Sequence, residues 1–257
     1  RTGVTSQKRS HLKRSLGYYE KSKKLDEALI IAHELLEASR SFGDKLEAEI
    51  ANAKILYKMG DETTALHQFN SIAKRLKSNR LAMGKRYEIL KTEVIYHLAL
   101  EDQRVFDGYE LAERSGSVKQ RINVKAKMFE TLARGYREIA EMNVSGYAAR
   151  ARYQMAVSAE SFVAEIKKLL ANSQSRLSDR EIVKIQSNTN RLSQIAKTYY
   201  AANIKMSSSL ALKSADRVWV NRSAVRLSSY GTAPPSVMSS EPTDMTISYE
   251  IPQVWSY

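Results

Sequence analysis

Four histidines and the absence of cysteine limit the chemistry open to this chain of 257 residues. No histidine has a second histidine three or four residues away, the spacing that places two metal ligands on one helix face. Without cysteine there is no disulfide, no thiolate nucleophile and no thiolate metal ligand. We therefore expect surface or partly buried helix residues at His33, His67 and His97. His11 is also isolated and lies in the polar and basic start of the chain.

Motifs for phosphate binding, acyl transfer, zinc hydrolysis and calcium binding are also missing. The sequence contains no glycine-rich phosphate loop, no G-x-S-x-G, no H-E-x-x-H and no EF-hand loop. Many carboxylates lie close to lysine or arginine, as Asp26 and Glu27 do after Lys23 and Lys24, which is typical of a solvated helix face. We expect no active site, no metal and no cofactor in this chain.

An excess of positive charge is the main chemical property of the sequence. The formal net charge is +13, and residues 206–257 add nothing to it because their basic and acidic side chains cancel. Basic side chains cluster within residues 8–14, 21–24, 75–86 and 114–127. Such clusters attract nucleic acid by releasing its counterions, but no helix-turn-helix, zinc-finger or RNP signature accompanies them. The charge allows nonspecific contact with nucleic acid, and the alternative is a solvated helix face.

Apolar runs of about 18 residues, the length that a membrane span needs, do not occur. The chain begins with polar and basic residues in place of the apolar stretch of a secretory signal. We expect a soluble intracellular protein without a membrane partner.

The elements that carry these side chains are expected to be helices. All four prolines lie within residues 234–252. The first 233 residues therefore lack proline, the amino acid that most disrupts a helix. Apolar residues recur at steps of three and four, and short connections favour antiparallel packing of sequential helices. We predict an all-α protein, an α-solenoid of antiparallel helix pairs. The first helix is expected at residues 25–36 and is followed by a turn at residues 42–44. Further helices are expected at residues 50–59, 65–76, 85–101, 105–114, 118–142, 146–171 and 179–204.

Residues 48–76 fit the spacing of a tetratricopeptide repeat, a helix pair that stacks on its neighbours. Such a repeat needs a small residue at the helix crossing, a glycine at the turn, an alanine early in the second helix and a bulky residue one turn later. Six residues are expected to pack this pair: Ala53, Leu56, Gly60, Ala65, Phe69 and Ala73. Ala28 and Ala32 fit the second helix of a preceding, degenerate unit. The alternative is an ordinary helical hairpin.

The composition changes near residue 206. Prolines begin, serines become frequent and helical periodicity fades over residues 206–257. The composition favours a largely disordered tail. Residues 217–226 and 247–251 alternate weakly between apolar and polar side chains, and the alternative is an extended segment that lies on a partner or on the helices. The expected organisation is a basic segment at residues 1–15, a helical-repeat domain at residues 16–205 and an irregular tail at residues 206–257.

Several stretches, in their order, resemble the helical FAT region of the ataxia-telangiectasia-mutated kinase family, which belongs to the phosphatidylinositol-3-kinase-related protein kinases. The resemblance rests on residues 47–76 (EAEIANAKILYKMGDETTALHQFNSIAKRL) and 123–139 (NVKAKMFETLARGYREI). It continues at residues 159–170 (AESFVAEIKKLL) and 184–196 (KIQSNTNRLSQIA).

This resemblance implies a role without catalysis by the chain itself. In that family the FAT helices form a curved solenoid that clamps around a kinase domain, and the kinase phosphorylates serine or threonine followed by glutamine in the nuclear response to DNA breaks. The implied partners are the kinase domain and the other helical repeats of a parent polypeptide, and the implied location is the nucleus. After Tyr199 the family continues with further FAT helices, whereas a serine- and proline-bearing stretch follows here. That departure indicates a fragment, a truncated product or another family.

Two other interpretations remain open. The chain could be a stand-alone tetratricopeptide-like adaptor that binds peptides in a groove. It could also be a basic structural protein, such as a virion or nucleic-acid-packaging component, whose tail docks on neighbouring molecules.

Overall fold

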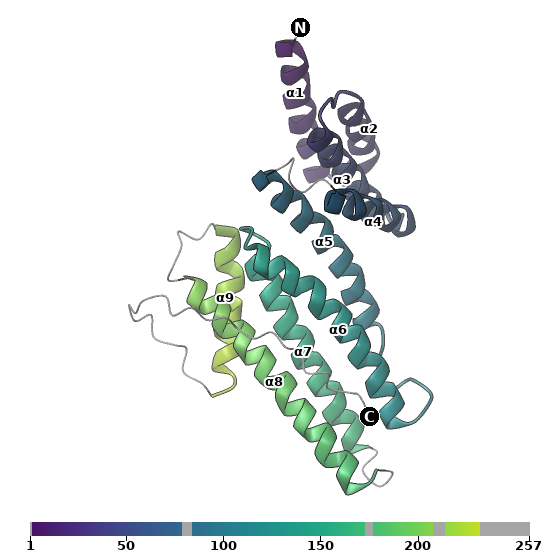
Figure 1. The fold of residues 1–257 in the computed structure, drawn as a ribbon, viewed down its shortest axis with the longest axis vertical. Helices are drawn as coiled ribbons and strands as arrows, with labels where there is room; N and C mark the ends of the chain where they lie inside the picture. Colours follow the sequence, from purple (N-terminus) through teal and green to yellow (C-terminus); the bar gives the residue numbers. More distant parts are fainter. Residues whose placement is uncertain (1, 79–83, 173–176, 208–213, 232–257) are drawn as a thin grey trace. The chain divides into compact units, whose positions relative to one another are not determined.

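The computed structural model describes residues 2–78, 84–172, 177–207 and 214–231, and these residues form helices and turns without a strand. The chain divides into two compact units, Arg1–Leu98 and Ala99–Tyr257. Figure 1 shows the helices in chain order. No helix in the described ranges combines the length and the apolar composition that a membrane span requires.

The first unit contains four helices and the first part of a fifth. They are α1 (Thr2–Lys21), α2 (Leu25–Glu37), α3 (Phe42–Met59), α4 (Glu62–Ser78) and the beginning of α5 (Gly84–Asp107). Each of α2, α3 and α4 packs on the helix before it. The expected boundary at residues 15–16 lies inside α1, whose Leu12 and Leu16 are buried with Ala28 and Ala32 of α2.

The ends of α3 follow from local sequence. The Ser41 side chain accepts a hydrogen bond of 3.1 Å from the Asp44 N–H, which caps the first turn. Gly60 ends the helix at φ 92°, a left-handed conformation that favours glycine. The prediction of a turn at residues 42–44 is therefore wrong, because the serine cap makes Phe42 the first residue of the helix.

The second unit contains the end of α5 and four further helices. They are α6 (Val118–Met142), α7 (Ala148–Ala171), α8 (Asp179–Ser207) and α9 (Ser214–Ser228). The α7 helix packs on α6 and α8, and α9 packs on both α7 and α8. Three aromatic rings, those of Phe106, Phe129 and Phe162, lie with centroids 5.9–6.0 Å apart in the core between α5, α6 and α7.

Two predicted segments differ in the structure. Residues 105–114 do not form a separate helix: α5 continues to Asp107, and turns follow as far as the Ser117 cap of α6. Residues 217–226 are neither extended nor disordered, since they belong to the α9 helix. Residues 216, 220, 223 and 227 are buried, and this helical spacing explains why the weak alternation of valines was misleading. Residues 247–251 lie outside the described residues.

Candidate functional site

The six predicted packing residues lie together in the first unit. Three are fully buried in one apolar cluster, two pack against its edge and the glycine ends α3: Ala53, Ala65 and Phe69; Leu56 and Ala73; Gly60. Residues from the first part of α5, among them Tyr87 and Leu90, join the cluster. These side chains form a core and leave no polar group among them for a ligand.

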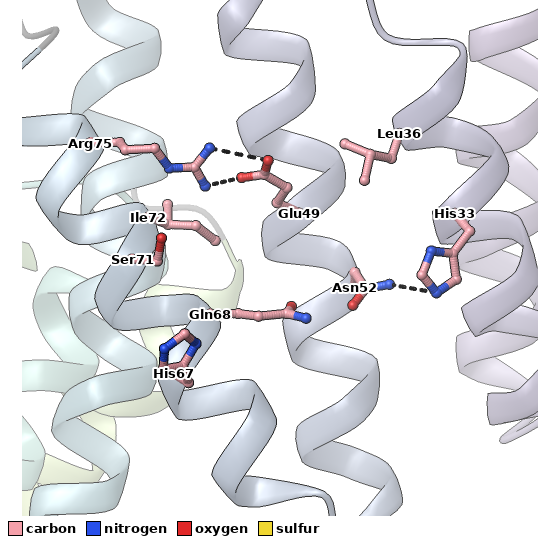
Figure 2. Close-up of a pocket in the computed structure, with 9 residues that line it drawn as sticks. All are labelled: His33, Leu36, Glu49, Asn52, His67, Gln68, Ser71, Ile72 and Arg75. Carbon is pink, nitrogen blue, oxygen red and sulfur yellow. Dashed lines mark hydrogen bonds and ion pairs between the residues drawn. The ribbon is translucent and has the colours of Figure 1, made fainter.

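A polar pocket lies on another side of the same helices, between α2, α3 and α4 (Figure 2). Its volume is about 270 Å³. The lining combines buried residues from α3 and α4 with half-buried and exposed side chains around them: His33, Leu36, Glu49, Asn52, His67, Gln68, Ser71, Ile72 and Arg75. Two of the four histidines, His33 and His67, therefore line one pocket from opposite sides (Figure 2), although they are 34 residues apart in the sequence.

Ionic and hydrogen-bonding contacts fix two sides of this pocket. The guanidinium group of Arg75 donates from both terminal nitrogens to the Glu49 carboxylate, one of these hydrogen bonds being 3.1 Å long. The Asn52 amide nitrogen lies 3.3 Å from Nε2 of His33. Because an amide nitrogen can only donate, the ring nitrogen is the acceptor in this contact. Sequence periodicity could not find the site because its residues come from three helices.

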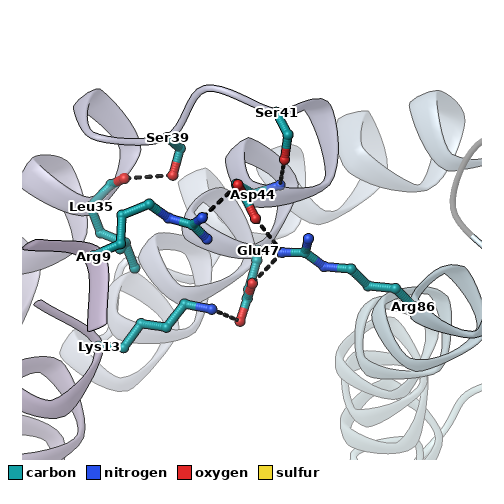
Figure 3. A network of polar contacts seen from close by, with 8 residues as sticks. All are labelled: Arg9, Lys13, Leu35, Ser39, Ser41, Asp44, Glu47 and Arg86. Atoms are coloured by element: carbon teal, nitrogen blue, oxygen red, sulfur yellow. Dashed lines mark hydrogen bonds and ion pairs between the residues drawn. The ribbon is translucent and has the colours of Figure 1, made fainter. Parts of the chain in front are cut away.

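A network of charged side chains joins α1, α3 and the first part of α5 (Figure 3). Arg9 and Arg86 both contact Asp44, at 2.6 and 2.7 Å. Glu47 binds Lys13 at 2.6 Å and also contacts Arg86. Although burial opposes it, hydrogen bonds from Arg86 and Ser41 and the charges of both arginines lower the pKa of Asp44.

The basic clusters that the sequence suggested for nucleic acid are partly engaged within the protein. Seven of their described cations donate to carboxylates or carbonyl groups of the same unit: Arg9, Lys13, Arg75, Arg86, Arg114, Arg121 and Lys125. Contact with nucleic acid therefore stays a prediction that depends on the other cations of these clusters.

Lys125 in the second unit is a buried cation that sequence analysis did not single out. Its ammonium group donates to the Tyr109 carbonyl at 2.7 Å and to the Glu165 carboxylate, and it lies 4.6 Å from the centre of the Phe106 ring. Glu165 also accepts a hydrogen bond of 3.2 Å from the Leu111 N–H. Lys125 thus ties the connection between α5 and α6 to α7. Lys125 lies three residues after Ile122 and four before Phe129, so the sequence already placed it on the apolar face of α6.

Polar contacts hold α9 on the second unit. Asp216, which is 3% exposed, accepts hydrogen bonds from the Ser145 hydroxyl at 2.6 Å and the Gly146 N–H at 2.8 Å. The Tyr200 hydroxyl donates to Glu160 at 2.7 Å. Burial and this hydrogen bond to a carboxylate raise the pKa of Tyr200 well above its ordinary value. The contacts connect α6, α7, α8 and α9 as parts of one packed body.

The described part of the chain contains no group of three or more histidine, aspartate or glutamate side chains placed to hold a metal ion. The described residues form an all-helical fold in which sequential helices pack on one another from α1 to α4 and from α6 to α9. Comparison of the chain with models of known families, with curated proteins and with solved structures finds no match.

Proposed function

We propose that the chain is a non-catalytic helical scaffold of a nuclear DNA-damage-response serine/threonine kinase, the family that its sequence resembles. Its helix pairs form a solenoid that packs around a kinase domain of the same polypeptide and restrains it. The chain itself supplies packing surfaces and no catalytic group.

The observation that carries this proposal is the helix that follows the resembling stretches. The resemblance implies further FAT helices after Tyr199, and sequence composition suggested an irregular tail in their place. In the structure α8 extends to residue 207 and α9 follows, packed on α7 and α8. A FAT-type helical array requires such a continuation, and α9 supports the proposal in this respect.

The character of the buried polar groups also supports a scaffold. Lys125 lies in the resembling stretch at residues 123–139, and its ammonium group anchors the connection between α5 and α6. Asp216 likewise binds a turn of the chain. Both groups fix the positions of helices, which is the role of buried polar groups in a rigid scaffold.

The test is whether kinase activity accompanies this chain in the cell. An antibody raised against residues 118–142 should precipitate, from nuclear extract, a polypeptide much longer than 257 residues. After DNA breaks are induced, the precipitate should phosphorylate a Ser-Gln peptide and leave the matched Ser-Ala peptide unmodified. A precipitate without this activity, or a polypeptide of about the length of this chain, would contradict the proposal.

A second candidate function is a stand-alone adaptor that binds peptides. The pocket between α2, α3 and α4 favours it, because an adaptor needs a recessed surface with hydrogen-bonding groups. The same precipitation separates the two candidates: an adaptor is recovered at the length of this chain and without kinase activity.

A further inference from the structure

We propose that the pocket between α2, α3 and α4 binds the main chain of a short, extended and uncharged segment of a partner protein. The inference goes beyond the proposed function, because it depends only on the pocket and holds for a kinase scaffold and for an adaptor alike. In this proposal, side chains of the pocket form hydrogen bonds with the peptide N–H and C=O groups of one stretch of the partner.

Asn52 is the central observation. The residue is 5% exposed and lines the pocket. Among the described residues its amide makes one hydrogen bond, to His33, although an amide side chain can take part in about four. The Asn52 amide oxygen is open to the pocket and not sealed from solvent. A ligand that enters the pocket can therefore replace water at this amide and supply its remaining hydrogen bonds.

Gln68 provides a second amide opposite the first. Figure 2 shows its side chain reaching from α4 toward Asn52 on α3. Within the described part of the chain, Gln68 has no hydrogen-bond partner. Each amide offers both a donor and an acceptor, and a peptide group presents the complementary acceptor and donor. Two facing amides therefore suit a main chain that passes between them.

The ion pair in the pocket favours an uncharged ligand over an ionic one. Its carboxylate, Glu49, and its guanidinium group, Arg75, are bound to each other through two hydrogen bonds. A phosphate or carboxylate ligand would have to compete with Glu49 for that guanidinium group, and a cation would have to compete with Arg75. The preferred ligand is therefore neutral.

The size and the apolar residues of the pocket narrow the ligand further. A volume of about 270 Å³ is smaller than the range of about 300–1,000 Å³ that is typical of small-molecule sites. Leu36 and Ile72 offer an apolar contact for one side chain. An extended segment exposes peptide N–H and C=O groups along its length, whereas a helix has already used most of its own.

The experiment selects ligands with the complete chain. Random 12-residue peptides displayed on phage are panned on the immobilised protein, and the dissociation constants of enriched peptides are measured by fluorescence anisotropy. Two variants remove the facing amides, Asn52→Leu and Gln68→Leu. The matched control is Asn70→Leu, since Asn70 is an exposed amide on α4 that donates to the Leu66 carbonyl of its own helix.

The expected result is at least a tenfold loss of affinity for both pocket variants and no loss for the control. Methylation of one main-chain nitrogen in the peptide should weaken binding more than replacement of the neighbouring side chain by alanine. Circular dichroism checks folding, and Gln68→Leu, a change at a half-buried position, keeps the test decisive if Asn52→Leu does not fold.

Three results would overturn the inference. They are the enrichment of no peptide, equal binding by the wild type and both pocket variants, and binding that depends on a charged peptide side chain. None of them affects the test of the proposed function, which is made on the cellular polypeptide.

Discussion

Replacement of Lys125 by methionine should destabilise the second unit of the protein. The change keeps the length and the apolar stem of the side chain but removes the ammonium group. That group is fully buried and binds the Tyr109 carbonyl and the Glu165 carboxylate. Without it, the carboxylate loses its counter-charge and keeps the hydrogen bond from the Leu111 N–H.

The expected magnitude follows from the exposure of the two charges. Breaking a buried ion pair on one side typically costs about 3–5 kcal/mol. The Glu165 side chain is 26% exposed, so water can solvate part of the orphaned charge and the loss should be about 2–3 kcal/mol. Glu165→Gln should cost more, about 3–5 kcal/mol, because the ammonium group left behind is fully buried.

Urea denaturation followed by circular dichroism measures these losses. The double variant Lys125→Met/Glu165→Gln should recover most of the stability, since it leaves no uncompensated charge. Lys127→Met is the matched control, because Lys127 is an exposed lysine two residues away on the same helix. A Lys125→Met variant as stable as the control, or single changes that simply add in the double variant, would refute the reasoning.

Three further predictions concern the first unit and the C-terminal helix. Ala65→Leu should overpack a fully buried site and cost about 1–3 kcal/mol, and Phe69→Ala should cost about 3–5 kcal/mol; unchanged urea midpoints would contradict both. The lowered pKa of Asp44 predicts stabilisation that is complete above about pH 5 and is lost as the pH falls through the unfolded and then the folded pKa. The stability difference between wild type and Arg86→Met, measured by urea midpoints, should therefore shrink from pH 6 to pH 3, and a constant difference would count against this ion pair. Ending the chain at residue 207 should lower the melting temperature by several degrees because α9 leaves buried surface behind, and an unchanged melting temperature would mean that α9 does not pack.

Local pattern was sufficient to predict most of the helical fold. Apolar spacing indicated the helices at residues 118–142, 146–171 and 179–204, whose observed ends differ by at most three residues. The same spacing brought Ala53, Ala65 and Phe69 to one buried cluster. Their assignment to a tetratricopeptide-like repeat, and the solenoid itself, stay predictions.

Contacts between distant residues explain what the pattern missed. The helix predicted at residues 105–114 is absent, and the turns there are held by Lys125 and Glu165, which come from α6 and α7. The α9 helix buries Asp216 and Ser223 on its packed face, so its apolar pattern is weak. Their partners include Gly146 and Asn203, which local periodicity could not connect to them.

The candidate pocket could not be predicted from the sequence either, because its lining comes from three different helices. His33 and His67 were correctly seen as lacking a nearby histidine in the sequence, yet they line one site because α2 and α4 lie on either side of α3. Asn52 carried no signal at all, since an asparagine within a helix is usually solvated and this one is buried.

The most direct measurement of the central claim is the sequence of the complete transcript that encodes this chain. The scaffold proposal predicts one open reading frame that extends upstream by thousands of codons and continues downstream into a protein-kinase domain. That domain should carry a phosphate-binding loop, a catalytic aspartate and a magnesium-binding motif. A reading frame that encodes these helices without any kinase domain would contradict the claim.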